Sequence, residues 1–457
     1  MLQQKAEKLA PFGTITTEDI VKVGKYKTPA YIYDDVFREE RCRQFLSMPN
    51  AFGLVVRYAM KANANATIVR RNSKAGLHID ASSLNEVRRA YMAEVPYEKI
   101  MLTTQEVPRG EDREELEEMI LRGLRYNACS MEQLRLITPF VSARKRAISV
   151  RLHPGEGGSG ESLTRDTANP YSCFGIHVSE FDKALRYALE NNVIVDGVHV
   201  HIGSGANPEK WKANINRVLG IISEHIGLLP NLKKVNFGGG FKEARMPDEE
   251  AANIEDLGLY AKEKLEEFAK KTGKQLVMEV EPGTYIMANS GYIVTQIMDI
   301  KKTGPEGFQF YVADGGLEVN PRVLFYASRH PFYLVSKEGK LLFSDFADTD
   351  NDSLEFWIPV GRCCESGDAQ SQKDVVNENG EPERIIIPRR MGQAEIGDYF
   401  VIGGAGAYCK EMAPANYNSH TKPPELIKEK DGSISLLRKP ETLEQVVQNE
   451  VYMPNFL

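Results

Sequence analysis

The strongest constraint on the fold is an alternation, from about residue 30 to residue 283, of short β-rich runs with runs whose apolar residues recur at helical spacing, such as Phe181–Leu189. This pattern is typical of parallel strands joined by helical crossovers. It predicts an α/β fold, a (β/α)8 TIM-type barrel. The expected strands are 30–33, 54–62, 78–82, 100–104, 147–153, 197–202, 234–237 and 276–281, with 126–129 as a further possibility.

A second domain is expected because 457 residues are too many for a single barrel of ordinary size. After about residue 290 the helical pattern fades, and β-type runs such as Tyr292–Thr295, Phe332–Val335 and Tyr399–Ile402 dominate. We therefore expect an N-terminal segment (1–29) that packs on the β-domain, a barrel (30–290), and a C-terminal antiparallel β-domain (291–457). The polar stretch 370–384 is interpreted as an exposed loop.

The composition is that of a globular protein, with 42% hydrophobic residues, 26% charged residues and a net charge of -7. The absence of a basic excess argues against nucleic acid as a partner. No apolar run is long enough for a signal peptide or a membrane span, so we expect a cytoplasmic protein without membrane contact. The six cysteines lack C-x-x-C spacing, and we expect reduced thiols and no metal site.

Lys61 is the first candidate for chemistry, because reactive groups of a parallel barrel lie at the C-terminal ends of its strands. It follows the apolar run Leu54–Met60, where partial desolvation would favour a neutral, nucleophilic amine. A single lysine is more often an ordinary surface residue. The sequence Ala-Asn-Ala-Asn that follows strengthens the functional interpretation.

A pair of histidines, His199 and His201, ends another predicted strand, with both side chains on one side of it. The pair is compatible with a metal site, although such a site needs further ligands. Alternatively, one imidazole stacks on a flat cofactor while Ser204 and nearby glycines bind a phosphate. Buried, purely structural histidines are the third possibility.

Two later strand ends carry Gly238-Gly239-Gly240 and Glu281-Pro282-Gly283. Glycines let backbone N–H groups approach an anion closely, although a triple glycine is as often a tight turn. A strand-end carboxylate can hold a proton on a pyridine nitrogen, although it can also simply end a strand. In the second domain, Cys364 stands beside the carboxylates Glu365 and Asp368 in the sequence. Tyr408 lies in a separate, glycine-rich bend.

Taken in order, these motifs resemble the fold-type III pyridoxal-phosphate decarboxylases, which include the diaminopimelate, ornithine and biosynthetic arginine decarboxylases. The resemblance spans nearly the whole chain and implies an alanine-racemase-like barrel followed by a β-domain. It is strongest to the diaminopimelate branch, through Asn320–Tyr326 and Ala413–Asn418. It implies conversion of meso-diaminopimelate to L-lysine and carbon dioxide, a step of lysine biosynthesis. The matching segments are Tyr58–Asn63, His201–Gly205, Gly238–Gly240, Glu281–Gly283 and Cys364–Asp368.

The resemblance also implies roles for individual residues. Lys61 would hold pyridoxal phosphate as a Schiff base, His201 would stack on its ring, and Glu281 would pair with the pyridine nitrogen. The remaining cofactor residues would be Asp80, Gly283 and, at the phosphate, Ser204, Gly238, Gly239, Gly240 and Tyr408.

For the substrate, the resemblance implies that Cys364 protonates the carbanion and Glu365 binds the distal ammonium group. Arg322 and Tyr326, together with Tyr408, would bind the distal carboxylate. Members of the family are homodimers with shared active sites, in which the Cys364–Glu365 pair comes from the neighbouring subunit.

The chain departs from the family pattern at Thr284, where most members have arginine after Glu-Pro-Gly. The segments around Cys173 and Asp80–Glu86 are also altered. Decarboxylation of another diamino acid, a D-amino acid or a carboxylated polyamine, as by ornithine, arginine or carboxynorspermidine decarboxylases, is therefore an alternative. A non-catalytic relative of the antizyme-inhibitor type is another, although the presence of Lys61, Glu281 and Cys364 argues against it.

Overall fold

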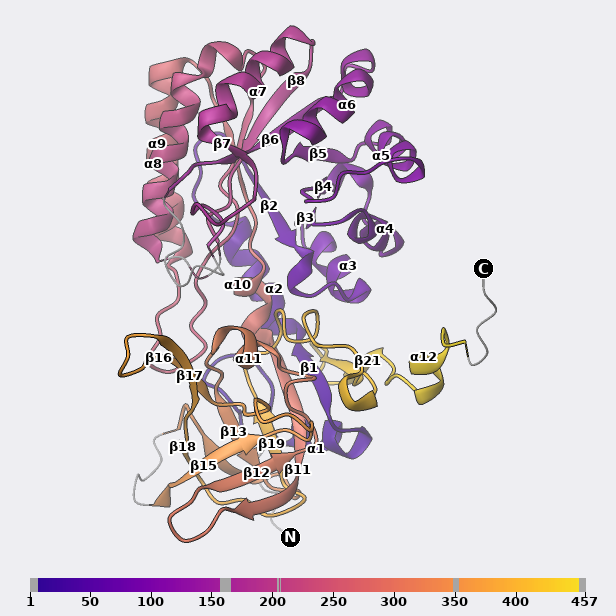
Figure 1. Cartoon of the computed structure of the whole chain (residues 1–457), viewed down its shortest axis with the longest axis vertical. Coiled ribbons are helices and arrows are strands. Elements are labelled where there is room, and N and C mark those ends of the chain that lie inside the picture. Colours follow the sequence, from indigo (N-terminus) through magenta and orange to yellow (C-terminus); the bar gives the residue numbers. More distant parts are fainter. Residues whose placement is uncertain (1–6, 157–165, 204, 206, 348–352, 452–457) are drawn as a thin grey trace. The chain divides into compact units, whose positions relative to one another are not determined.

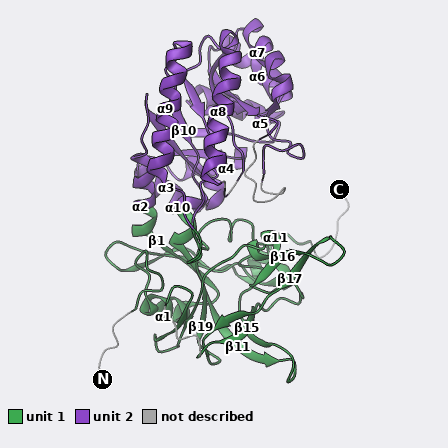
Figure 2. Ribbon diagram, turned by 90° about the vertical axis from the view of Figure 1, so that its left-hand side faces the viewer, with its two compact units in different colours: residues 1–38, 244–249, 287–457 green, residues 39–243, 250–286 purple. Residues whose placement is uncertain are grey.

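The computed structural model describes residues 7–156, 166–203, 205, 207–347 and 353–451, and the chain divides into two compact units (Figures 1 and 2). The barrel unit comprises residues 39–243 and 250–286. The sheet unit comprises residues 1–38, 244–249 and 287–457. No helix among the described residues is long and apolar enough to cross a membrane.

The barrel unit contains a closed barrel of eight parallel strands, as predicted. Its strands pair in chain order, and β10 pairs with β2, which closes the ring. The short strand β7 (Ile176–His177) pairs only with β6. The eight strands are β2 (Leu54–Ala59), β3 (His78–Ala81), β4 (Ile100–Leu102), β5 (Arg125–Ala128), β6 (Ala147–His153), β8 (Ile194–His199), β9 (Lys234–Asn236) and β10 (Val277–Val280).

Helices connect consecutive strands of the barrel. The predicted helical segment lies in α7, which buries Phe181, Leu185 and Ala188 on one face. Helix α9 ends at Gly273, whose φ of 73° is a left-handed conformation that glycine adopts without strain. The connecting helices are α3 (Ala66–Lys74), α4 (Leu84–Met92), α5 (Glu111–Leu121), α6 (Met131–Ala143), α7 (Val178–Glu190), α8 (Pro208–Glu224) and α9 (Ile254–Thr272). Helices α2 (Asp35–Leu46) and α10 (Thr284–Met287) flank the barrel strands in the sequence.

One expected barrel strand was wrong. Ala30–Tyr33 lies in β1 (Ala30–Asp34), which pairs with β11 and β20 of the sheet unit. The eighth barrel strand is instead β5, the segment that the sequence offered only as a further possibility. All five residues of β1 are buried, and a strand covered on both faces has the same apolar pattern in either sheet.

The sheet unit is built on a ten-stranded, mainly antiparallel sheet, in which β1–β20 and β12–β15 are the parallel pairs. Helix α1 (Thr17–Tyr26) contributes Ile20 and Val23 to a core shared with Val294 and Val401. Besides β1, the strands of this sheet are β11 (Gly291–Lys302), β12 (Gln309–Ala313), β13 (Phe332–Val335), β14 (Leu341–Ser344), β15 (Glu355–Val360), β18 (Arg389–Met391), β19 (Tyr399–Ile402), β20 (Glu425–Lys428) and β21 (Ile434–Arg438). The short helices α11 (Arg322–Tyr326) and α12 (Leu443–Val447) complete it.

The stretch 370–384, expected as a loop, instead contributes to a hairpin of β16 (Gln372–Val376) and β17 (Pro382–Ile386). The turn is closed by the Gly380 N–H, which donates to the Asn377 carbonyl at 2.9 Å, and Gly380 has a φ of 79°. Strand β17 is exposed throughout, as expected of the segment. The polar composition indicated the exposure of most of residues 373–384, but it indicated neither the burial of Gln370, Ser371 and Gln372 nor the strand pairing.

Candidate active site

Most of the predicted cofactor residues lie at the C-terminal ends of five strands that are consecutive in the barrel, in the order β3, β2, β10, β9 and β8. Lys61 lies in a 3-10 turn (Met60–Ala62) after β2, and Asp80 lies in β3. The glycines follow β9 and Glu281 follows β10. His201 comes two residues after β8, which ends at His199. The fold therefore brings these residues to one end of the barrel.

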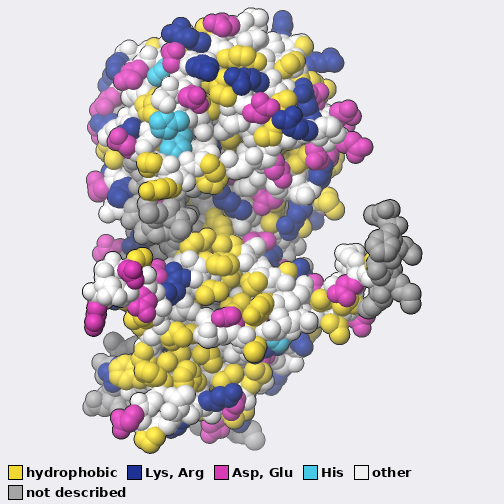
Figure 3. Space-filling model, viewed as in Figure 1, with side chains coloured by type: hydrophobic (Ala, Val, Ile, Leu, Met, Phe, Trp, Pro, Cys, Tyr) yellow, Lys and Arg dark blue, Asp and Glu magenta, His cyan; other side chains and the backbone are white. Residues whose placement is uncertain are grey.

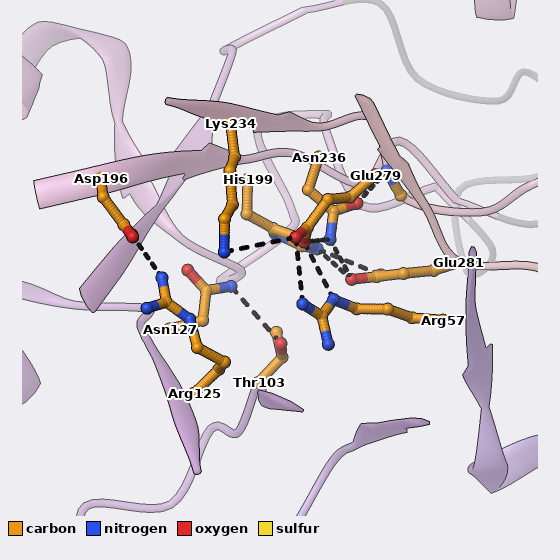
Figure 4. A network of polar contacts seen from close by, with 11 residues as sticks. Arg57, Thr103, Arg125, Asn127, Asp196, His199, Lys234, Asn236, Glu279 and Glu281 are labelled. Atoms are coloured by element: carbon orange, nitrogen blue, oxygen red, sulfur yellow. Dashed lines mark hydrogen bonds and ion pairs between the residues drawn. The ribbon is translucent and has the colours of Figure 1, made fainter. Parts of the chain in front are cut away.

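Glu281 is a buried carboxylate held by two donors (Figure 4). The Nε2 atom of His199 lies 3.0 Å from Oε1, and the Asn236 amide donates to the same oxygen at 2.7 Å. Burial alone raises the pKa of Glu281, but interactions with His199, His201 and Lys61 outweigh it and lower the pKa to about 2. Burial also lowers the pKa of His199, so its imidazole is neutral and donates a hydrogen bond to the ionised Glu281.

A second buried carboxylate, Glu279, supports the first (Figure 4). Its two oxygens accept from Nε and Nη2 of Arg57 at 2.9 and 3.0 Å, and both side chains are almost fully buried. The amide of Asn236 lies 3.5 Å from Glu279 and so bridges the two carboxylates. Because Arg57, Asn236 and Glu279 come from β2, β9 and β10, this bidentate pair fixes the strands that carry the site.

His201 packs tightly against the glycine segment. Its Nδ1 accepts the Gly239 N–H at 3.0 Å, and the Gly238 N–H donates to Asn236 Oδ1 at 2.8 Å. A Cβ on Gly238 would lie 2.5 Å from the Val200 carbonyl oxygen, and one on Gly239 would lie 2.4 Å from that of Glu281. Only glycine fits at these two positions.

The N–H groups of the three glycines therefore differ in whether they are available to bind an anion. Gly238 and Gly239 donate within the chain, whereas the Gly240 N–H has no acceptor among the described residues. Ser204, the other residue expected at a phosphate, lies outside the described residues.

The imidazole of His201 is neutral, because burial and the charges of Lys61 and Arg151 hold its pKa well below the ordinary value. Both histidines make hydrogen bonds to protein groups, His199 to Glu281 and His201 to Gly239. This arrangement favours the flat-cofactor interpretation over a metal-binding pair.

Lys61 is exposed, so the expected partial desolvation was wrong. The residue lies in a turn beyond the end of β2, in which its neighbours Met60 and Ala62 are buried. Its charge nevertheless acts on Asp80, His201 and Glu281. Gly283 explains how the turn is positioned, because a Cβ there would lie 3.1 Å from that of Ala62.

Asp80, another of the predicted cofactor residues, is buried with incomplete hydrogen bonding. Burial and the neighbouring charge of Glu281 hold its pKa well above the ordinary value, against the opposing charge of Lys61. Its Oδ1 is buried and has no hydrogen-bond partner in the described part of the chain. A buried carboxylate oxygen without a partner is costly, and its presence at the barrel end is typical of a ligand site.

The sheet unit brings together another group of predicted residues. The guanidinium of Arg322 lies 5.7 Å from the ring centre of Tyr326 and 5.8 Å from that of Tyr408. Arg322 is buried and also donates to Ser328 at 3.2 Å. Tyr408 has a φ of 66°, a strained backbone conformation for a residue with a side chain.

Cys364 and Glu365 lie apart from this cluster in the sequence, in the segment Gly361–Asp368. Both are exposed, and the Cys364 N–H donates to Asn418 Oδ1 at 2.8 Å. Buried Asp368 shapes the segment by accepting the N–H of Cys363 at 2.9 Å.

Sequence reasoning missed Arg57, Asn236 and Glu279. A signal was present for two of them: Arg57 and Glu279 are polar within apolar strands, and Glu279 stands two residues before Glu281. Polar residues at inward positions of barrel strands need partners, so they predict a buried network even where its pairing is not evident.

The chain is similar to known decarboxylases over nearly its whole length. A family model described as "Pyridoxal-dependent decarboxylase, pyridoxal binding domain" matches residues 39–288. The diaminopimelate decarboxylase of Escherichia coli (strain K12) is 28% identical over 444 residues, covering 96% of this chain and 97% of the relative. That of Methanothermobacter thermautotrophicus is 28% identical over 435 residues, covering 93% and 92%. A crystal structure of a diaminopimelate decarboxylase superposes with a TM-score of 0.83 at 25% identity, covering 96% of this chain and 97% of the other.

Proposed function

The chain belongs to the family of pyridoxal-dependent decarboxylases, and we propose that it converts meso-diaminopimelate to L-lysine and carbon dioxide, a step of lysine biosynthesis. The observation that carries the proposal is the group of Lys61, His201 and Glu281 after strands β2, β8 and β10, at one end of the barrel, with Glu281 ionised. The substrate is proposed from the relatives, which are diaminopimelate decarboxylases and match this chain over nearly their full length.

The residues present fit pyridoxal phosphate. Asp80 has an unpartnered buried oxygen, Gly238 and Gly239 leave no room for side chains, and Gly240 has an uncommitted N–H among the described groups. When bound, the cofactor supplies a protonated pyridine ring that accepts the electrons left by the departing carboxylate.

Each residue of the barrel unit has a defined task in this proposal. Lys61 would attach the cofactor, the carboxylate of Glu281 would keep the proton on the pyridine nitrogen, and the neutral ring of His201 would stack on the cofactor. Gly283 supports the turn of Lys61, and Asp80 contributes a polar contact. The phosphate would be held by Ser204, Gly238, Gly239 and Gly240, and Tyr408 of the sheet unit is a further proposed phosphate residue.

Residues of the sheet unit bind the substrate and return the proton. Arg322, Tyr326 and Tyr408 bind the distal carboxylate, Glu365 binds the distal ammonium group, and the Cys364 thiol protonates the carbon that has lost its carboxylate. The planar fork of Arg322 suits a carboxylate, and its stacking on two tyrosines restricts its orientation.

A homodimer with shared active sites is part of the proposal, with Cys364 and Glu365 contributed across the interface. Figure 3 shows hydrophobic side chains gathered over strands of the sheet unit. Exposed apolar residues of this unit include Met298, Phe308 and Phe356. Apolar surface of this kind is typical of an interface between subunits.

A second candidate substrate is favoured by Thr284, the first residue of α10, where most family members have arginine. The loss of a cation at this position is the difference that motivates the same chemistry on another diamino acid, a D-amino acid or a carboxylated polyamine. The distinction concerns the substrate and leaves the reaction unchanged.

The test is release of carbon dioxide by the purified protein with added pyridoxal phosphate. The panel contains meso-diaminopimelate, L-ornithine, L-arginine, D-amino acids and carboxynorspermidine, and the Lys61→Ala variant is the control. We expect carbon dioxide and L-lysine from meso-diaminopimelate. Release from another compound alone would support the second candidate, and no release from any would contradict both.

A further inference from the structure

We propose that Glu318, Cys363 and His420, in the sheet unit, form a binding site for a divalent transition metal of the zinc type. One ligand atom from each residue lies within 4.8 Å of the other two. Glu318 and Cys363 are buried and His420 is half-buried. None of the three ligands has a role in the proposed decarboxylation, although Cys363 directly precedes Cys364 in the chain. The site was not expected from the sequence because its ligands come from three distant segments.

The carboxylate of Glu318 is held in a fixed orientation. Its Oε1 accepts from Nε of Arg362 at 3.0 Å, and its Oε2 accepts the Gly316 N–H at 2.8 Å. The thiol of Cys363 lies 3.3 Å from the same Oε2. Partners that orient a ligand in this way are a regular part of metal sites.

The third ligand is available for coordination. Neither ring nitrogen of His420 has a hydrogen-bond partner among the residues that the structure describes, although its backbone carbonyl accepts from Asn416 at 3.1 Å. Glu318 and His420 also line a cavity of about 40 Å³, which is enough for a water molecule as a fourth ligand. Three protein ligands and one water is a common arrangement around zinc.

The charges are compatible with a divalent ion. The thiol releases its proton to solvent as the sulfur–metal bond forms, so the thiolate and the Glu318 carboxylate together balance two positive charges. Arg362 then pairs with the outer carboxylate oxygen, while buried Asp368 beside Cys363 adds negative charge. The cations on the cavity wall, Lys410, Lys422 and Arg438, each pair with a glutamate.

The mixed ligand set selects the metal. Sulfur, imidazole nitrogen and carboxylate oxygen together suit zinc or cobalt(II), whereas magnesium and calcium prefer oxygen ligands alone. The alternative interpretation is a structural cluster in which the Cys363 thiol simply donates to Glu318. The two interpretations differ in whether sulfur binds an added metal.

The experiment is a titration of chelator-treated full-length protein with Co²⁺, recorded as difference spectra against metal-free protein of the same cofactor content. We expect one equivalent of Co²⁺ to bind, with a sulfur-to-cobalt charge-transfer band and visible bands of four-coordinate cobalt, and we expect Zn²⁺ to displace it. The absence of any charge-transfer band would overturn the proposal.

Variants assign the ligands. Cys363→Ser should abolish the charge-transfer band, and His420→Asn should weaken Co²⁺ binding by at least about tenfold. The exposed thiols Cys173 and Cys364 serve as controls, and serine at either position should leave the band intact. A band that survives in Cys363→Ser, or disappears in Cys364→Ser, would contradict the assignment. Because the readout is metal binding, it is independent of decarboxylase activity.

Discussion

The imidazole of His199 lies with Nε2 3.0 Å from Oε1 of Glu281, and both side chains are buried within the barrel. A neutral histidine in this position donates a hydrogen bond, which stabilises the ionised carboxylate without adding a buried charge of its own. The proposed reaction depends on this state, because Glu281 must be ionised to accept a hydrogen bond from a protonated pyridine nitrogen.

Replacing His199 with phenylalanine removes the donor and should raise the pKa of Glu281 from about 2 toward or above its ordinary value of 4.5. Since a depressed pKa means that the ionised form is lost only at strongly acidic pH, the acidic limb of kcat should move to higher pH in the variant. The measurement is kcat between about pH 4 and pH 8. His177→Phe, at an exposed histidine, is the control and should leave the limb in place. An unchanged limb in His199→Phe would show that this hydrogen bond does not set the ionisation of Glu281.

The pair of Arg57 and Glu279 should be strongly coupled. Arg57→Met leaves the Glu279 carboxylate buried without its bidentate partner, with Asn236 at 3.5 Å and Lys234 at 3.9 Å, and should lower the free energy of unfolding by about 3–5 kcal/mol. The double variant Arg57→Met/Glu279→Leu should recover most of this loss, because two packed apolar groups replace a desolvated ion pair. Chemical denaturation of the single and double variants measures the coupling. Additive losses would mean that the pair does not act as a unit.

Gly239→Ala should be poorly tolerated, because the new Cβ would lie 2.4 Å from the backbone oxygen of Glu281. We expect a loss of about 2 kcal/mol and a melting temperature lower by roughly 4–8 °C, together with weaker cofactor binding. Gly220→Ala is the matched control, since Gly220 lies in α8 with open space around it. Alanine there should be neutral or stabilising by up to about 1 kcal/mol. Equal effects of the two substitutions would contradict the packing argument.

Arg322 tests the proposed substrate. Arg322→Lys keeps the positive charge but loses the planar fork, and should raise the KM for meso-diaminopimelate by about 10- to 100-fold. The matched control is Arg329→Lys, at an arginine of the same unit that is paired with Asp248 on the surface. Steady-state kinetics with meso-diaminopimelate give KM and kcat separately. If the KM for meso-diaminopimelate did not change, Arg322 would not bind its distal carboxylate.

The sequence predicted the barrel well, because inward apolar runs and helical spacing are local properties. It could not assign Ala30–Asp34 to the right sheet, since a strand buried on both faces looks the same in either. At the site, the strand ends identified Lys61, His201 and Glu281, whereas the partners of Glu281 depend on which strands are neighbours. Asn236 and His199 meet Glu281 only because β8, β9 and β10 are adjacent in the ring.

The glycine segment shows the same limit in finer detail. Three consecutive glycines predicted close approach to an anion, whereas the crowding at Gly238 and Gly239 is against the backbone oxygens of Val200 and Glu281. The N–H groups of Gly238 and Gly239 donate to Asn236 and His201, respectively. These hydrogen bonds depend on tertiary contacts that no local sequence pattern encodes. The exposure of Lys61 likewise depends on what surrounds its turn.

The attachment of the cofactor to Lys61 is the central claim, and one measurement tests it most directly. The protein is incubated with pyridoxal phosphate, reduced with borohydride, digested and analysed by peptide mass spectrometry. We predict a phosphopyridoxyl group on the peptide that contains Lys61, and none on any peptide of the Lys61→Ala variant. A label on a different lysine of the wild-type protein, with Lys61 unmodified, would contradict the account.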